Sequence, residues 1–196
     1  MERKFVSTQR FNIRQITTIG VLSAISIVLG ITNLGFIPIP PVSATILHIP
    51  VIIGSILEGP IVGAMVGLIF GIFSIIQAIT KPTPLSFLFL NPIVSVIPRV
   101  AIGIISYYVY RAVKVKSENF KIALGAIVGS LTNTIGVLGF IYLIYLKSYA
   151  EALGIADLSA AKTAIVTIAA TNGLPEAIIS MLIVVPVVKV MNKIKK

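Results

Sequence analysis

The sequence contains few charged residues and no cysteine. Asp, Glu, Lys and Arg together make up 11% of its 196 residues, whereas 57% are hydrophobic. Because a soluble domain usually carries about 25% charged residues, this composition excludes a water-soluble protein. The absence of cysteine excludes disulfides and thiolate metal sites, and the single histidine cannot form a metal site that needs two histidine ligands.

The sequence also lacks the motifs of the common enzyme classes. It has no glycine-rich phosphate-binding loop, no HExxH metal motif, no GxSxG nucleophile motif and no glycine-rich dinucleotide turn. A membrane hydrolase built on Glu176 and His48 would need a second acid or a nucleophile triad, which the sequence does not provide. We therefore expect no catalytic residue, no metal and no cofactor, and no ATP hydrolysis by this chain alone.

Long apolar runs predict an all-α integral membrane protein with six transmembrane helices in a single domain, residues 1–196. A helix needs about 20 apolar residues to cross the roughly 30 Å hydrocarbon core of a bilayer. The second run is only about three turns long and contains Pro50, so we expect it to be tilted, broken or extended into its flanking loop. The predicted spans are Ile16–Asn33, Ile46–Leu57, Ile61–Ile79, Pro92–Arg111, Ile122–Leu146 and Thr163–Val190.

The positions of lysine and arginine predict the orientation of the chain, because positive residues near span ends are retained in the cytoplasm. With six spans and both termini in the cytoplasm, twelve basic residues lie on the cytoplasmic side and three lie outside. The net charge of +10 therefore reflects topology, and we expect no nucleic-acid partner. The cytoplasmic set is Arg3, Lys4, Arg10, Arg14, Arg111, Lys114, Lys116, Lys121, Lys189, Lys193, Lys195 and Lys196, and the outer set is Lys81, Lys147 and Lys162.

Polar residues inside the predicted spans indicate a ligand pocket that opens to the outside. A polar or ionisable group in the bilayer is costly unless it is paired or faces a wet cavity. Six such side chains from four spans fall between the outer surface and the midplane, beneath outer loops at 34–45, 80–91 and 147–162 that are longer than a connection requires. The expected substrate-binding residues are Arg99, Asn133, Asn172, Glu176, His48 and Asn91.

Five of these six residues also have a structural explanation. Arg99 and Glu176 can form an ion pair that neutralises both charges within the bundle. Asn133 and Asn172 can form hydrogen bonds between helices that serve only packing. His48 can be a satisfied polar group near the interface.

The sixth predicted span contains the sequence TNGLPE at residues 171–176. Its glycine and proline weaken a helix, so we expect a local break or kink at the depth of the pocket. Irregular backbone is tolerated in a membrane where it is buried in protein or lines a cavity, which favours a ligand site at this position.

Small residues at four-residue spacing predict close contacts between helices. The third span carries a series of glycines, which we expect to pack inside the bundle, with docking of another subunit as the alternative. The first span carries Gly20-xxx-Ala24, a pattern equally suited to a partner protein and to internal packing. The expected helix-packing residues are Gly59, Gly63, Gly67 and Gly71.

The order of three short motifs resembles one family over nearly the whole chain. These motifs are HIPVIIG (48–54), EGP (58–60) followed by the glycine series, and NGLPE (172–176) in the last span. Together with the six-span layout they resemble the substrate-binding S components of energy-coupling factor (ECF) vitamin transporters. The resemblance implies a vitamin-capturing subunit in the cell membrane that docks on a transmembrane coupling protein carrying two ATP-binding-cassette ATPases. It also implies docking through small residues of the first span, here Gly20 and Ala24.

The HIPVIIG stretch looks most like pantothenate-type S components. The resemblance implies pantothenate as the ligand, with Arg99 as the partner of its carboxylate and Asn133, Asn172 and Glu176 serving its amide and hydroxyls. Three alternatives stay open at this point: an S component for riboflavin or another small vitamin, a solitary transporter or channel, and a membrane scaffold protein.

Overall fold

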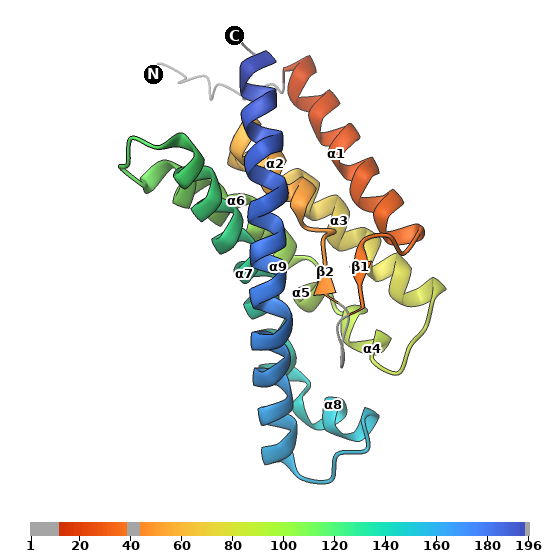
Figure 1. Cartoon of the computed structure of the whole chain (residues 1–196). Helices are drawn as coiled ribbons and strands as arrows, with labels where there is room; N and C mark the ends of the chain where they lie inside the picture. The colour runs from red at the N-terminus through yellow and green to blue at the C-terminus, as the bar shows by residue number, and fades with distance from the viewer. Residues whose placement is uncertain (1–11, 39–43, 195–196) are drawn as a thin grey trace, which may run out of the picture.

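The structure, a computed structural model, describes residues 12–38 and 44–194, and this part is almost entirely helical (Figure 1). The helices are α1 (Ile13–Ile31), α2 (Ile49–Glu58), α3 (Pro60–Thr80), α4 (Ser86–Phe89), α5 (Pro92–Ser95), α6 (Ile97–Ala112), α7 (Glu118–Ile144), α8 (Leu146–Ala152) and α9 (Leu158–Ile194). Strands β1 (Phe36–Ile37) and β2 (Ala44–Thr45) pair antiparallel, with Phe36 opposite Thr45. The basic residues Arg3, Lys4, Arg10, Lys195 and Lys196, used above to predict topology, lie outside the described residues.

Five helical segments of the described part are long and apolar enough to cross a membrane, when α5 and α6 are counted as one segment, and α2 is not among them. Its ten residues extend over about 15 Å, half of the hydrocarbon thickness. Eight of the ten are buried, so α2 lies inside the bundle. Pro50 does not break this helix, because it is the second residue of α2, where a missing N–H leaves no hydrogen bond unmade.

Two further predicted spans differ from the structure. The span predicted over 92–111 is divided into α5 and α6, with the division at Val96. Of the break or kink expected at residues 171–176, the break is absent: α9 continues as one helix of 37 residues through Pro175 and Pro186. The connections predicted to lie outside also contain elements that the sequence did not predict, namely the β1–β2 hairpin, α4 and α8.

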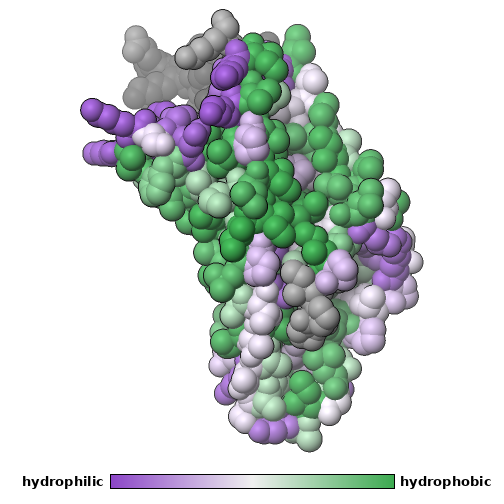
Figure 2. All heavy atoms as spheres, viewed as in Figure 1, coloured by the Kyte–Doolittle hydropathy of each residue, from purple (hydrophilic) through white to green (hydrophobic). Residues whose placement is uncertain are grey.

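The ends of the long helices place most of the described basic residues together. The start of α1, the end of α9 and the link between α6 and α7 lie at one end of the bundle, whereas α8 lies at the other (Figure 1). Figure 2 shows hydrophobic residues over much of the visible face and a hydrophilic cluster at the α6–α7 link. Helix α9 packs mainly on α7, α7 packs on α6, and α6 packs on α3, while α1 covers α2 and α3 from one side.

Glycines of α3 bring this helix against the chain of α5 and α6. A Cβ atom on Gly63 would lie 2.9 Å from the Cα atom of Gly103, and one on Gly71 would lie 2.8 Å from the carbonyl oxygen of Ser95. A Cβ atom on Gly67 would overlap the backbone carbonyl of Arg99. Gly59 differs from the expectation, because it lies between α2 and α3 with a φ of +101° and no other chain segment approaches its Cβ position. Its role is the turn and not helix packing.

Substitution of Gly67 by alanine tests this close packing. The added methyl group would collide with the Arg99 carbonyl, and overpacking of this kind costs about 1–3 kcal/mol. We expect Gly67→Ala to lower the thermal unfolding midpoint of the purified protein in detergent. Gly139→Ala is the matched control, because no atom lies within 4 Å of that Cβ position and alanine favours a helix. Equal midpoints for the two variants would contradict the packing.

Candidate ligand-binding site

A cavity of about 690 Å³ lies among α3, α4, α6, α7, α9 and the β1–β2 hairpin. This volume is within the range of pockets that bind small molecules, about 300–1,000 Å³. Four of the six predicted site residues line it: Arg99, Asn133, Asn172 and Glu176. The other polar lining residues are Asn33, Thr45, Ser74, Gln77, Lys81, Thr83, Ser86 and Thr134, and the remainder are mostly apolar, including Phe36, Phe70 and Phe89.

The division between α5 and α6 determines where the Arg99 guanidinium lies. Pro98 has no backbone N–H, so the carbonyl of Val94, four residues earlier, has no helical donor. Nη1 of Arg99 donates to this oxygen over 2.7 Å. The proline therefore leaves a free acceptor one turn from Arg99, and the guanidinium is turned toward α5 to reach it.

Arg99 is buried and lies between two aromatic rings. The centre of its guanidinium is 5.5 Å from the ring centroid of Phe70 and 5.8 Å from that of Phe89, distances at which a cation and an aromatic face attract each other. The ion pairs in the described part of the chain join Arg14 to Glu58 and Lys121 to Glu118. The alternative of an Arg99–Glu176 ion pair is therefore not formed, and Nε of Arg99 is buried without a hydrogen-bond partner among the described residues.

Glu176 connects α9 to two other parts of the cavity wall. Its Oε1 atom accepts a hydrogen bond of 2.6 Å from the backbone N–H of Thr45 in β2. Its Oε2 atom accepts one of 3.0 Å from the hydroxyl of Thr134 in α7. The carboxylate thus fixes the hairpin over the cavity while its remaining lone pairs stay available to a ligand.

Asn133 and Asn172 contribute amide groups from α7 and α9. Both side chains are buried, and Oδ1 of Asn133 has no hydrogen-bond partner among the described residues. Oδ1 of Asn172 is 3.4 Å from the hydroxyl of Thr171. A buried amide oxygen without a partner is costly, so Asn133 presents an acceptor for which a ligand donor is suited.

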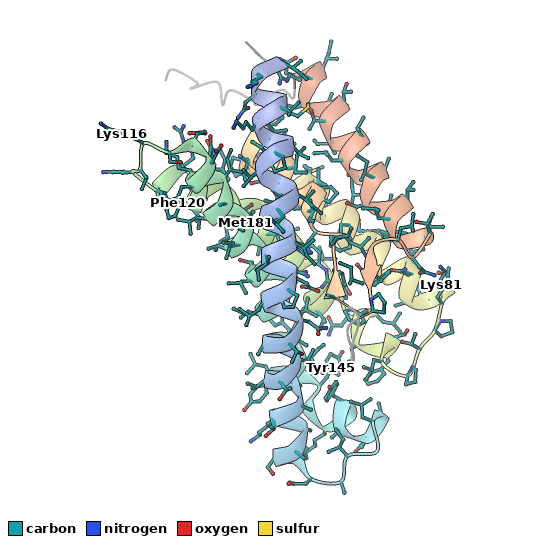
Figure 3. The ribbon with its side chains drawn as sticks, in the orientation of Figure 1. Lys81, Lys116, Phe120, Tyr145 and Met181 are labelled. Carbon is teal, nitrogen blue, oxygen red and sulfur yellow. The ribbon has the colours of Figure 1, made fainter. Side chains whose placement is uncertain are left out.

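His48 and Asn91 lie outside the cavity lining, unlike the prediction. Nε2 of His48 is 3.1 Å from the hydroxyl of Ser130 and 2.9 Å from that of Ser180, so His48 joins the start of α2 to α7 and α9. Asn91 caps α5 by accepting from the N–H of Ile93, and its amide nitrogen donates to the hydroxyl of Tyr145, labelled in Figure 3. Both side chains hold the helices together in the absence of any ligand.

Comparisons with known proteins agree with a membrane protein. The model of the ECF transporter substrate-specific component family matches residues 14–188. The chain belongs to this family. The S component is also 36% identical over 171 residues, 78% of its own length and 80% of the relative's, to the pantothenic acid transporter PanT of Lactococcus lactis subsp. cremoris (strain MG1363). It is accordingly a multi-pass protein of the cell membrane and a transport component, not an enzyme.

Several lining residues of the S component were not predicted. Phe70 and Phe89 resemble the other apolar residues of their segments, and nothing in the sequence distinguishes them. Thr134 follows Asn133 on α7, and only Asn133 of this pair was predicted to bind a ligand. Gln77 could have been found, since it is an uncharged polar residue inside the third predicted span.

The small residues of α1 lie on its outer face. Gly20 and Ala24 are exposed, and no atom lies within 4 Å of a Cβ position on Gly20. Val21, Ile25 and Val28 are exposed on the same side of the helix. Within the described part of the chain this surface is not used for internal packing.

Removal of the His48 imidazole should destabilise the S component. His48→Ala would leave the hydroxyls of Ser130 and Ser180 without this partner and open a hole in the core, together about 2–4 kcal/mol. We expect a lower thermal unfolding midpoint in detergent. Ser130→Ala is the milder control, because Nε2 keeps its contact with Ser180. A His48→Ala protein as stable as the original would show that these hydrogen bonds contribute nothing.

Proposed function

We propose that this S component captures pantothenate from outside the cell for an ATP-driven ECF importer. The observation that carries the proposal is the Arg99 guanidinium, which is buried in a cavity without an ion-pair partner among the described residues. A buried cation of this kind favours an anionic ligand that supplies the missing charge. The similarity to a named pantothenic acid transporter supports the choice of anion.

The chemistry of the lining matches the groups of pantothenate. Arg99 binds the carboxylate in a charge-assisted pair, which Phe70 and Phe89 shield from water. Asn133 and Asn172 bind the amide, and Glu176 accepts from a hydroxyl. His48 and Asn91 support the helices around the site. Riboflavin carries no carboxylate, so it would supply no anionic group to pair with Arg99.

We further propose six membrane crossings with both termini in the cytoplasm. The start of α1, the end of α9 and the α6–α7 link share one end of the bundle, as this topology requires (Figure 1). The short α2 then crosses together with the β1–β2 hairpin and the chain before it. Since the positive end faces the cytoplasm, the cavity opens outward.

The outer face of α1 is the proposed docking surface for the transmembrane coupling protein that carries the two ATPases. Gly20 and Ala24 leave a shallow strip on a helix whose own bundle does not cover it. Helices in a bilayer associate through such strips, because their backbones can approach closely.

Calorimetric titration of the purified protein tests the ligand. We expect saturable binding of pantothenate and none of riboflavin. Arg99→Met should weaken pantothenate binding by at least about tenfold, since a hydrogen bond to a charged group contributes about 1.5–3 kcal/mol. The pantothenate affinity of Arg99→Lys should lie between those of the original protein and Arg99→Met, because lysine keeps the charge but loses the planar guanidinium.

The alcohol analogue of pantothenate, in which a hydroxymethyl group replaces the carboxylate, provides the control. It should bind the original protein weakly and lose little further affinity in Arg99→Met. Equal affinity of the original protein for the acid and the alcohol would contradict the role of Arg99. Thermal unfolding of each variant shows whether a loss of binding reflects a loss of folding.

Bulky residues on α1 test the docking surface. Gly20→Leu and Ala24→Leu should reduce copurification of the coupling protein while leaving pantothenate binding unchanged, because neither residue lines the cavity. Gly139→Leu adds the same bulk on α7, where no atom lies within 4 Å of the Cβ position. Normal copurification of the coupling protein with both α1 variants would show that this face of α1 is not the docking surface.

A further inference from the structure

The C-terminus of α1 is capped by side chains from another helix. The last four carbonyls of an α-helix have no donor within the helix. In α1, the Val28 carbonyl accepts from the N–H of Thr32 and the Leu29 carbonyl accepts from the N–H of Gly35, both over 3.0 Å. The Gly30 and Ile31 carbonyls accept instead from α3 and the residue that follows it.

The two donors are Gln77, in the last turn of α3, and Lys81, the residue that follows the helix. Nε2 of Gln77 donates to the Gly30 carbonyl over 3.1 Å, and Nζ of Lys81 donates to the Ile31 carbonyl over 3.2 Å. Figure 3 labels Lys81 at the end of α3, close to the end of α1. A cation at this place also interacts favourably with the C-terminal end of the helix dipole.

Both donors line the ligand cavity. A carbonyl only accepts hydrogen bonds, so the nitrogen of the Gln77 amide must face Gly30, and the amide orientation is fixed by α1. The Lys81 ammonium has three N–H groups, of which one is used on Ile31. Lys81 is exposed whereas Arg99 is buried, so the two cations lie at the mouth and in the depth of the same cavity.

We propose that Gln77 and Lys81 are ligand-binding residues held in place by the C-terminus of α1, so that occupancy of the cavity and capping of α1 are linked. The inference rests on the proposed function in taking pantothenate as the ligand. A ligand oxygen bound by Lys81 and a ligand donor bound by Gln77 immobilise both side chains in the orientation that caps α1. By thermodynamic reciprocity, the capped helix end then favours the bound ligand to the same extent. Helix α1 also carries the proposed docking face. Ligand binding would therefore change the capping of the same helix that docks on the coupling protein.

Hydrogen–deuterium exchange of residues 28–38 in the full chain tests the capping without any ligand. Gln77→Met and Lys81→Met keep side-chain length but remove the donors. Each should speed exchange at the end of α1 by about fivefold, the effect of one lost hydrogen bond. Lys162→Met is the matched control, since Lys162 is another exposed lysine of the predicted outer side and does not line the cavity. Unchanged exchange in both donor variants would overturn the proposal.

The same experiment with saturating pantothenate tests the link. In the original protein and in Lys162→Met, the ligand should slow exchange of residues 28–38. In Gln77→Met and Lys81→Met, calorimetry should show affinity lowered by about tenfold, and the ligand should no longer protect the segment. Binding without protection in the original protein, or unchanged affinity in both donor variants, would refute the link. If calorimetry shows no pantothenate binding to the original protein, the proposed ligand fails, whereas the exchange of the ligand-free variants still decides the capping.

Discussion

A backbone carbonyl inside a bilayer has no water to bond, so any carbonyl that a helix leaves free must find a donor within the protein. Pro98 creates such a carbonyl at Val94, and the Arg99 guanidinium supplies the donor. The Arg99 side chain, the most costly one to place in the membrane, is therefore oriented by its hydrogen bond to a backbone carbonyl that lacks a helical donor. The orientation exists before any ligand arrives, which lowers the entropy lost on binding.

The same constraint explains the connection between α1 and α2. In the part that the structure describes, this segment is not helical, and side chains of α1 and α9 form hydrogen bonds with its backbone. Glu176 accepts from the N–H of Thr45, and the hydroxyl of Ser26 donates to the Leu47 carbonyl. The residues that form the cavity wall thus also support the irregular backbone beside it, so the site and the fold cannot be altered independently there.

The cost of polar groups in a membrane was enough to predict that Arg99, Asn133, Asn172 and Glu176 line a cavity, because a polar group inside a bilayer must be paired or face a wet cavity. Predicted depth in the membrane could not distinguish these cavity residues from His48, which lies at the start of a buried helix and forms hydrogen bonds with two serines. Gln77 was missed because a long polar side chain near a span end can reach water, so its burial does not follow from its position. The helix α9 shows a further limit, since a proline removes one hydrogen bond while a long helix can continue on the others.

The sequence contains little indication of which helices lie at the side of the bundle and which lie inside it. Both α1 and α3 are long and apolar enough to cross a membrane, yet only three residues of α1 are buried, compared with six in α3. The difference arises from tertiary position, because α1 lies at the side of the bundle and α3 between its neighbours. Hydropathy indicates whether a segment can enter the lipid, but it does not indicate where the helix lies in the bundle.

The length of α9 has a consequence for work on this protein outside the membrane. Its 37 residues extend over about 55 Å, more than the roughly 40–45 Å of a whole bilayer with its headgroups. At the α8 end of the helix, Tyr149 and Ala150 are buried against their neighbours and brace α9, so this end forms a rigid post. For a chain of 20.9 kDa, that post offers an epitope for an antibody fragment large enough to align single particles in electron microscopy.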